Sequence, residues 1–314
     1  MSNDDSLSVK VLNWVKNEGY TLEMRVARIF QQSGFSVSRF EPYVDPESDD
    51  LREVDVVASV NRQFSGIEVF VTLFVECKYF SKPWVVFVSP RRLGRFSYFS
   101  RILNNEFAVH EWRHQDTLQG RLLARILSSL GHQKISTLSL FLTPQIVGYG
   151  MTESLRGGLD HAYEAIMQVG KCVEAHDIEA ETDLERAVEL YDETKYRRDP
   201  RETEFMLSCS IAFPIIVGKG KLFECYLDEN SETIVSEVDE SVILVPSRRH
   251  RDTGGARSSS SVLRVVTEKR LEYFATEAFE AASALLSQER AMEDVWEYER
   301  DKAVEGLEAQ EIPF

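Results

Sequence analysis

Three charged residues at the ends of apolar segments are the ones best suited to do chemistry. Asp55 interrupts the segment EVDVVA, and Glu76 and Lys78 end the run VFVTLFVECKY at 69–79. Buried charges are costly unless they are paired, so their position needs an explanation. Neighbouring strands can bring Asp55 and Glu76 within reach of one hard cation, such as Mg²⁺ or Mn²⁺, which prefers oxygen ligands. Lys78 shares a strand face with Glu76 and could orient an attacking water or stabilise negative charge.

Two further groups are candidates for the same site. The backbone carbonyl of Cys77 can supply another oxygen ligand. Glu23 lies at the edge of the buried stripe of a predicted helix. That stripe recurs at i, i+4, i+7 and i+8, at Leu22, Val26, Ile29 and Phe30. The sequence therefore predicts a site built from one helix and two strands, and a salt-bridged strand end without a metal is the simpler alternative.

The apolar patterns predict the elements that position this site. A helix is expected over 11–32, with a break at Gly19 and its end at Gly34. An acidic turn with two prolines is expected over 41–50. Short connections join three expected strands, at 35–40, 53–60 and 69–79. This order favours an antiparallel meander beside a helix.

The remainder of the chain alternates between predicted strands and helices. Further strands are expected at 135–142, 205–217, 221–228, 233–245 and 262–267. The apolar segment 82–88 is expected to be either another strand or the entry to a helix. Further helices are expected at 107–129, 160–176, 179–195 and 268–310. The strands that flank Gly218–Lys221 are predicted to form a hairpin. We divide the chain into a core at 9–150, a helical connector at 151–200, and a β-hairpin with C-terminal helices at 201–314 that packs on the core.

Three segments, GYTLEMRVARIFQQSGFSV, REVDVVA and LFVECKY, resemble the PD-(D/E)XK, or restriction-endonuclease-like, nuclease superfamily. The likeness is nearest to its type IV restriction enzyme and Holliday-junction-resolvase groups, and it covers about residues 15–145. It implies an α/β fold with a core of mixed β-sheet flanked by helices. The C-terminal β-hairpin and helices would extend that core.

The resemblance also implies an activity. It assigns Asp55, Glu76 and Lys78 as the catalytic residues, and Glu23 as the acidic residue of the first helix. The implied enzyme is a hydrolase, an endonuclease that uses Mg²⁺ or Mn²⁺ to cut phosphodiester bonds. DNA is favoured over RNA as its substrate. The implied setting is bacterial restriction, antiviral defence or repair.

The charge is divided unevenly along the chain. Residues 1–150 hold 17 Lys and Arg against 16 Asp and Glu, whereas residues 151–314 hold 19 against 36. A polyanion is therefore expected to contact the first half, and the acidic half is expected to be a solvated surface or a face for a protein partner. We expect DNA as the main partner, with a second protein or a second copy of the chain as a further one.

A basic and aromatic segment follows the central strand. It interleaves arginines with aromatic residues, at Arg91, Arg92, Arg95 and Arg101 and at Phe96, Tyr98 and Phe99. Phosphate contacts and base stacking both suit these residue types, so the four arginines are predicted to bind nucleic acid. A helix with arginines on its solvated side is the alternative.

A second motif predicts a different chemistry. The segment His110-Glu111-Trp112-Arg113-His114 matches HExxH, in which two histidines one helical turn apart bind Zn²⁺ and the glutamate is the general base of a peptidase. Arg113 occupies a position that is usually uncharged, and the longer zinc-peptidase continuation is absent. Zinc peptidase is therefore one alternative function. A catalytically inactive nuclease-like module in a larger complex is the other.

The composition bears on where the protein works. The chain has no run of eighteen apolar residues, and its N-terminus, MSNDDSLSVK, is polar and acidic. Its four cysteines form no CxxC pair. We therefore expect a cytoplasmic protein with reduced thiols and no membrane association.

Overall fold

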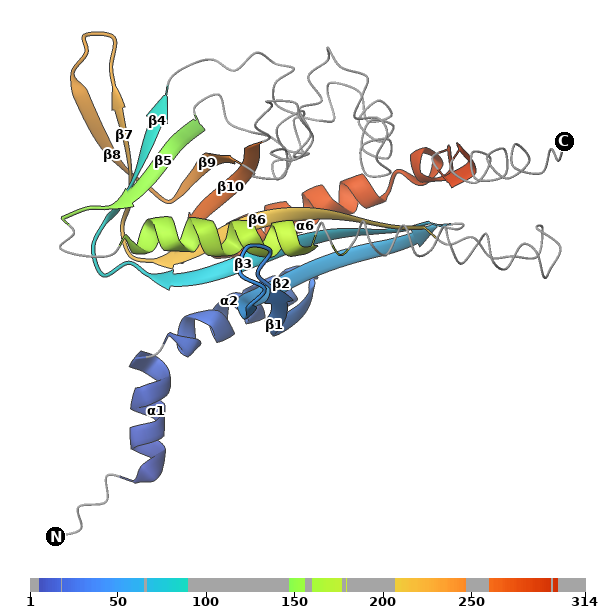
Figure 1. Cartoon of the computed structure of the whole chain (residues 1–314), viewed down its shortest axis with the longest axis horizontal. Helices are drawn as coiled ribbons and strands as arrows, with labels where there is room; N and C mark the ends of the chain where they lie inside the picture. Colours follow the sequence, from blue (N-terminus) through green and yellow to red (C-terminus); the bar gives the residue numbers. More distant parts are fainter. Residues whose placement is uncertain are drawn as a thin grey trace, which may run out of the picture.

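A computed structural model of the chain contains one mixed β-sheet of ten strands (Figure 1). The structure describes residues 6–17, 19–64, 67–89, 147–155, 160–176, 179, 207–246, 260–294 and 296–298. The strand order is β1-β2-β3-β6-β10-β9-β5-β4-β7-β8. The predicted α/β class, a mixed sheet flanked by helices, is confirmed at this level.

The first three strands form the predicted antiparallel meander. They are β1 (Ser36–Val44), β2 (Leu51–Phe64) and β3 (Ile67–Tyr79). Strand β1 is longer than expected, because residues 41–44 belong to the strand and the acidic turn begins only at Asp45. Since β1 is an edge strand, Pro42 can occupy it without removing a hydrogen bond from the interior of the sheet.

The prediction that the strands flanking Gly218–Lys221 form a hairpin is wrong. Strand β6 (Leu207–Lys219) runs parallel to β3 on one side and to β10 (Ser260–Thr267) on the other. Strand β7 (Leu222–Leu227) instead pairs with β4 (Trp84–Ser89) and β8 (Thr233–Val238). The reason is that β6 is apolar on both faces, so it is buried between two other strands and is not the arm of an exposed hairpin. The C-terminal β-hairpin of this chain is β7–β8.

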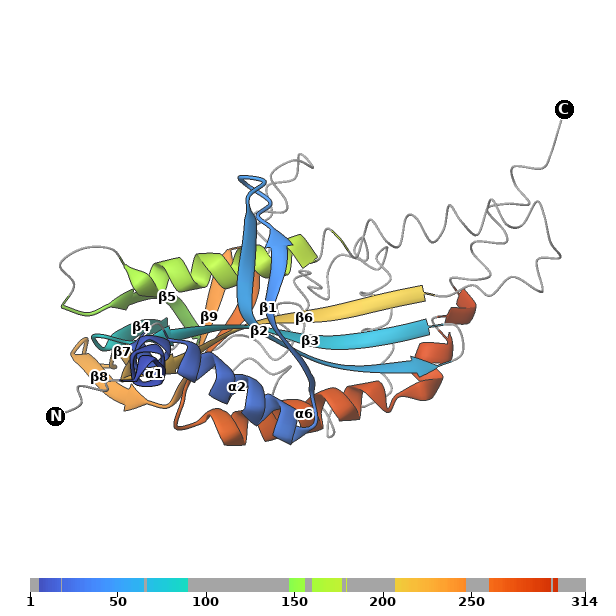
Figure 2. The same cartoon turned by 90° about the horizontal axis from the view of Figure 1, so that it is seen from below.

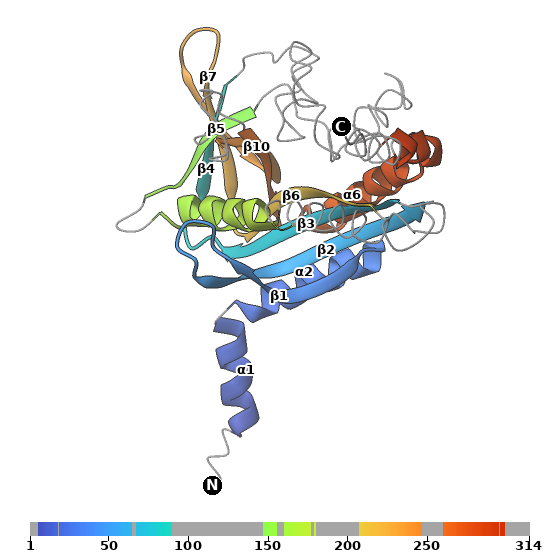
Figure 3. The same cartoon turned by 45° about the vertical axis from the view of Figure 1, so that its right-hand side comes forward.

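The far half of the sheet contains strands from both ends of the chain. Strand β9 (Glu240–Pro246) pairs with β10 and meets β5 (Val147–Glu153), which pairs with β4. Figure 3 shows β4, β5, β7 and β8 standing at an angle to β1, β2 and β3. The strands before and after residue 150 thus share one sheet, and the three-part division of the chain stays a prediction.

Helices cover both faces of the sheet around β3 (Figure 2). On one face, α2 (Tyr20–Ser33) and α6 (Leu271–Leu286) pack on alternate residues of β3, with Phe30 and Phe274 in the shared core. On the other face, the helix at 161–176 packs over Phe74. Burial on both sides explains why β3 is a continuous apolar run. No helix among the described residues is long and apolar enough to cross a membrane.

Two glycines set the ends of α2, as predicted. Gly19 has φ 92° and separates α2 from α1 (Leu7–Asn17), which begins four residues before the expected start. Gly34 has φ 110°, and its N–H and that of Phe35 bond back to the carbonyls of Gln31 and Phe30. This closes the helix in a Schellman-type turn, which needs the left-handed conformation that glycine adopts without strain.

We expect Gly218→Ala to destabilise the protein by about 1–3 kcal/mol through overpacking. A methyl group there would lie 1.7 Å from Cζ of Phe80, whose ring is stacked on Trp84 with centroids 3.9 Å apart. Urea unfolding measures the effect. Gly150→Ala is the matched control, because nothing lies within 4 Å of its added methyl group. Equal midpoints for the two variants would contradict this account of Gly218.

Candidate active site

The register of β2 and β3 brings Asp55 beside Glu76. The ladder pairs Val56 with Val75, so Asp55 and Glu76 would form the next pair, but the ladder ends there. Oδ2 of Asp55 instead accepts a hydrogen bond of 2.7 Å from the backbone N–H of Cys77. Because the N–H and C=O of one strand residue face the same neighbour, the Cys77 carbonyl also faces this gap. The structure thus places the three predicted oxygen donors at one strand end.

Glu76 and Lys78 lie on the same face of β3, as the alternation predicts. Glu76 is 1% exposed and forms an ion pair with the ammonium group of Lys78 through Oε1. Lys78 is also 3.5 Å from Oε1 of Gln168, on the helix at 161–176. The ammonium group is therefore held between the central strand and the helix that covers it.

Glu23, on α2, is the third carboxylate of the site. We call Asp55, Glu76 and Glu23 together the carboxylate group. Glu23 is on the buried face of α2 and is 8% exposed, in agreement with its predicted place at the edge of the buried stripe. It lies close enough to Asp55 and Lys78 for their charges to influence its ionisation. Three carboxylates from one helix and two strands therefore surround a single ammonium group.

Two oxygens of this group are buried without a hydrogen-bond partner. They are Oε2 of Glu23 and Oε2 of Glu76, and no other buried side-chain oxygen or nitrogen of the described residues is unpartnered in this way. Leaving such a group unsatisfied costs about 1–3 kcal/mol, and more when it is charged. A divalent cation, or water bound to one, would satisfy both oxygens and offset the excess of negative charge.

The donor set fits Mg²⁺ or Mn²⁺ better than a metal held by protein ligands alone. Among the residues that the structure describes, no group of three or more His, Cys, Asp or Glu side chains has the spacing of a complete metal site. Mg²⁺ usually takes only one or two carboxylates and completes its shell with waters and substrate phosphate. Asp55, Glu76 and the Cys77 carbonyl would hold the ion, and Glu23 would hold a water or a second position.

The two glutamates have strongly raised pKa values. Burial raises the pKa of Glu76 to about 8, and the charge of Asp55 adds to this while Lys78 opposes it. Burial raises the pKa of Glu23 to about 7, again with a contribution from Asp55 and opposition from Lys78 and Arg39. Pairs of acids that perturb one another in a buried position are typical of functional sites.

The other groups of the site show which roles they can fill. Burial raises the pKa of Asp55, although the Cys77 N–H and Lys78 favour its ionised form. Burial disfavours the charge of Lys78, but Glu76 and Asp55 outweigh it and raise the pKa of Lys78 above its ordinary value. Burial raises the pKa of the Cys77 thiol well above its usual range. Lys78 is therefore suited to stabilise negative charge as a cation, and the Cys77 thiol is not a nucleophile.

The turn between β1 and β2 fastens the covering helix over the site. Asp45, which is fully buried, accepts hydrogen bonds from Arg52 at 2.6 Å and Lys171 at 2.9 Å. Two residues before Asp45, the hydroxyl group of Tyr43 donates a hydrogen bond of 3.3 Å to the backbone carbonyl of Gln168. This network, which we call the clasp, fixes the helix at 161–176 so that Gln168 faces Lys78.

The sequence analysis did not single out the residues of the clasp or Gln168. Asp45 is one of several acids in an exposed-looking turn, and nothing local distinguishes it as buried. The helix that contains Gln168 was predicted, but its periodicity does not say which strand it covers. No local pattern pairs Asp45 with Lys171, because the two residues are 126 positions apart.

Several predicted features lie outside the described residues. The four arginines expected to bind nucleic acid, at 91, 92, 95 and 101, are among them, as is the HExxH segment at 110–114. Two other histidines are described. His161 pairs with Glu164 on the surface, and Nε2 of His176 lies 2.7 Å from Oγ of Ser210. Neither lies in a cluster of metal ligands among the described residues.

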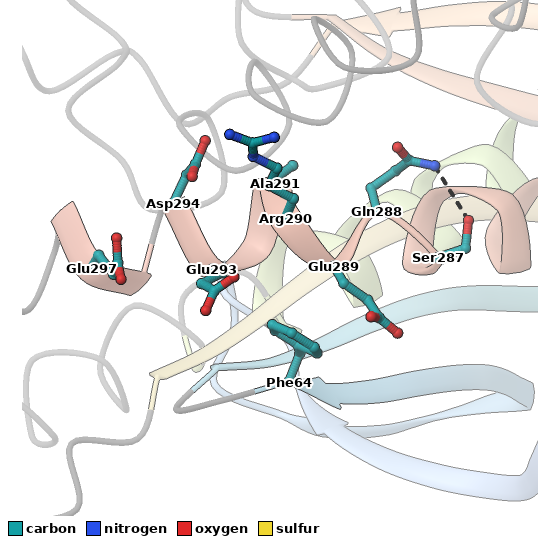
Figure 4. Close-up of a pocket in the computed structure, with 9 residues that line it drawn as sticks. All are labelled: Phe64, Ser287, Gln288, Glu289, Arg290, Ala291, Glu293, Asp294 and Glu297. Atoms are coloured by element: carbon teal, nitrogen blue, oxygen red, sulfur yellow. Dashed lines mark hydrogen bonds between the residues drawn. The ribbon is translucent and has the colours of Figure 1, made fainter.

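A surface hollow at the other end of the sheet is unrelated to the carboxylate group. Figure 4 shows it between Phe64 and the segment that follows α6, with the acidic Glu289, Glu293, Asp294 and Glu297 around it. Phe64 lies nine residues from Asp55 along β2, which is about 30 Å at ~3.3 Å per residue. The hollow therefore has no part in the chemistry proposed below.

Comparison with known proteins gives no match: no family model, no curated protein and no solved structure is similar to this chain at a significant level. A proposal of function for this chain therefore rests on the geometry of the site and on the resemblance of its motifs.

In the metal-free protein, Glu76→Gln is expected to raise the thermal stability at pH 8. The pKa of Glu76 is raised from 4.5 to about 8 in the folded state, so its ionisation opposes folding increasingly as the pH rises through this interval. The amide has no charge to bury and still offers Lys78 an acceptor. Melting curves in EDTA at pH 5 and pH 8 test this, with Glu272→Gln on an exposed position of α6 as the control. A Glu76→Gln protein that melts below wild type at pH 8 would refute it.

Asp45→Asn is expected to lower the free energy of unfolding by about 2 kcal/mol at neutral pH, because it weakens two charged hydrogen bonds. Burial alone would raise the pKa of Asp45, but Lys171 and Arg52 lower it. Its stabilising contribution is therefore present above the unfolded pKa of about 3.9 and is lost as the pH falls through the lower folded value. Urea unfolding from pH 3 to pH 7 measures this.

The control for the clasp is Asp49→Asn, an exposed position in the same turn whose φ of 57° asparagine tolerates. Its stability should follow that of wild type at every pH. If the two asparagine variants behave alike, the clasp does not stabilise the fold as described.

Proposed function

We propose that this protein is a metal-dependent nuclease of the restriction-endonuclease-like type, which hydrolyses phosphodiester bonds of DNA. The observation that supports it best is the pair of buried, unpartnered carboxylate oxygens of Glu23 and Glu76, next to Asp55 and Lys78. A fold gains no stability from such oxygens, so their retention is best explained by a ligand that binds them.

The topology agrees with the resemblance on which the proposal also rests. The helix with Glu23 is followed by the meander with Asp55 and Glu76, and the later strand β6 lies parallel beside β3 in a mixed sheet flanked by helices. Asp55 is partly exposed at the strand end where β2 leaves β3, whereas Glu76 is buried, so a phosphate would approach from the side of Asp55. These features support a restriction-endonuclease-like core.

Each residue has a distinct part in the proposed hydrolysis. A bound Mg²⁺ or Mn²⁺ would supply positive charge for the phosphate and lower the pKa of its water. Asp55, Glu76 and the Cys77 carbonyl would hold this ion. Lys78 keeps its proton at neutral pH and stabilises the charge that develops on the phosphate oxygens. Overall, the OH of water is added to phosphorus, one P–O ester bond breaks, and the leaving oxygen takes the remaining proton.

The proposed biological setting follows from the resemblance. It is bacterial restriction, antiviral defence or repair, in the cytoplasm. The net charge of −16 opposes tight binding to DNA by the chain alone, which favours a protein partner or a second copy that helps to deliver the substrate.

The test is cleavage of supercoiled plasmid and of single-stranded DNA in Mg²⁺ or Mn²⁺. We expect Asp55→Asn and Lys78→Met each to lower the rate by about 10²-fold or more, as losses of charge-stabilising groups do. Glu68→Gln is the matched control, because Glu68 lies on the same strand and bonds to Asn61 away from the site. Its rate should equal that of wild type.

Three other results would change the assignment. Cutting that survives both substitutions would place the activity elsewhere. Metal binding without cutting of any substrate would favour an inactive nuclease-like module. Stoichiometric zinc that is lost on His110→Ala would favour the peptidase.

A further inference from the structure

Three aromatic side chains form a row beside the carboxylate group. The ring of Trp14 on α1 lies 5.4 Å from that of Tyr20 on α2, and Tyr20 lies 6.1 Å from Phe40 on β1. Trp14 is 53% exposed and Phe40 is 41% exposed. Figures 1 and 3 show α1, the helix that contains Trp14, projecting from the body of the molecule. We call these three residues the aromatic row.

The aromatic row is next to the site. Tyr20 follows Gly19, where an added methyl group would lie 3.9 Å from Oε1 of Glu23 and 3.8 Å from the ring of Tyr79. Tyr79 is itself exposed, with the ammonium group of Lys219 5.2 Å from its ring centroid. The start of α2 therefore brings Glu23 and the exposed ring of Tyr79 together, one residue before Tyr20.

The backbone at Phe40 is an independent indication. Its φ of 56° is left-handed, a conformation that costs a residue such as phenylalanine energy. The pairs Arg39–Val56 and Glu41–Val54 place Phe40 opposite Asp55 on the next strand. Strained residues that persist tend to lie at functional sites. Here the strain presents an exposed ring beside a predicted metal ligand.

Basic side chains lie on the same elements as the row. Helix α1 contains Lys10 and Lys16 and no acidic residue, and Arg39 on β1 is exposed and close enough to lower the pKa of Glu23. The exposed Glu41 also adjoins Phe40, so the cations that can meet a phosphate are these three side chains and not a continuous basic surface. Exposed aromatic rings interleaved with basic side chains are the usual platform for single-stranded nucleic acid, whose bases are free to stack.

We propose that the aromatic row binds unpaired bases of single-stranded DNA and leads that strand to the carboxylate group. This rests on the proposed function and specifies its substrate: a single strand, or the single-stranded part of a branched or flapped duplex. A base-paired duplex cannot use the row, because its bases are already stacked. Lys16 and Arg39 contact the phosphates on either side.

The test measures binding in EDTA, so that no cleavage is required. Fluorescence anisotropy compares an oligothymidylate, an oligouridylate and a blunt duplex, each of about 20 units. We expect the oligothymidylate to bind most tightly. Trp14→Ala and Phe40→Ala should each weaken it by about 5-fold or more, since a stacked base contributes about 1–3 kcal/mol. Phe40→Trp should retain the affinity.

Two controls separate binding from folding. Tyr149→Ala removes an even more exposed ring on β5, in the far half of the sheet, and should leave the affinity unchanged. Phe40→Gly relieves the left-handed strain, so its melting temperature should not fall although its affinity does. A Phe40 whose role is only structural would give the reverse pattern.

The proposal would be overturned by three results. The first is an unchanged affinity in Trp14→Ala and Phe40→Ala. The second is tighter binding of the duplex or of the oligouridylate. The third is a dimer that Trp14→Ala dissociates without changing the affinity for the oligonucleotide. Its failure differs from that of the nuclease proposal. Asp55→Asn should lose cleavage but keep oligothymidylate binding, because it leaves the row intact. A wild-type protein that binds the oligothymidylate but cuts no DNA would refute the nuclease proposal and leave this one standing.

Discussion

The hydrogen bond from the Cys77 N–H to Asp55 is the interaction on which the site depends. It takes the place of the ladder bond that β2 would otherwise accept, at the point where β2 separates from β3. The backbone donor stays satisfied, so the strands can part without an unpaired group. The gap that results contains the side chains of Asp55 and Glu76 and the Cys77 carbonyl. A strand end has thereby become a position lined by oxygen atoms.

The cost of this arrangement is electrostatic. Three carboxylates share one ammonium group in surroundings that disfavour charge, and the pKa values of Glu23 and Glu76 rise for that reason. A cation at this site would have to displace protons, so the metal binding proposed here would become tighter as the pH rises through this range. The core on both faces of β3 provides the stability that offsets this cost.

The surroundings of the site come from segments far apart in the sequence. The clasp ties the turn after β1 to a helix more than a hundred residues later, and through Gln168 it reaches Lys78. On the other side, Gly19 and Phe40 both have left-handed backbone: Gly19 adjoins Glu23 and the ring of Tyr79, and Phe40 lies opposite Asp55. The carboxylate group is therefore enclosed by a packed helix on one face and bordered by aromatic side chains on the other.

The sequence by itself determined the local elements and the candidate donors. Helical spacing placed Glu23 at a buried edge, alternation placed Glu76 and Lys78 on one face, and Gly34 marked the end of α2, because each depends only on near neighbours in the chain. The tertiary structure decided what no local pattern contains. Strand β6 pairs with β3 and not with β7, and Asp45 is buried by Lys171, because long-range pairing depends on which apolar faces and charges meet.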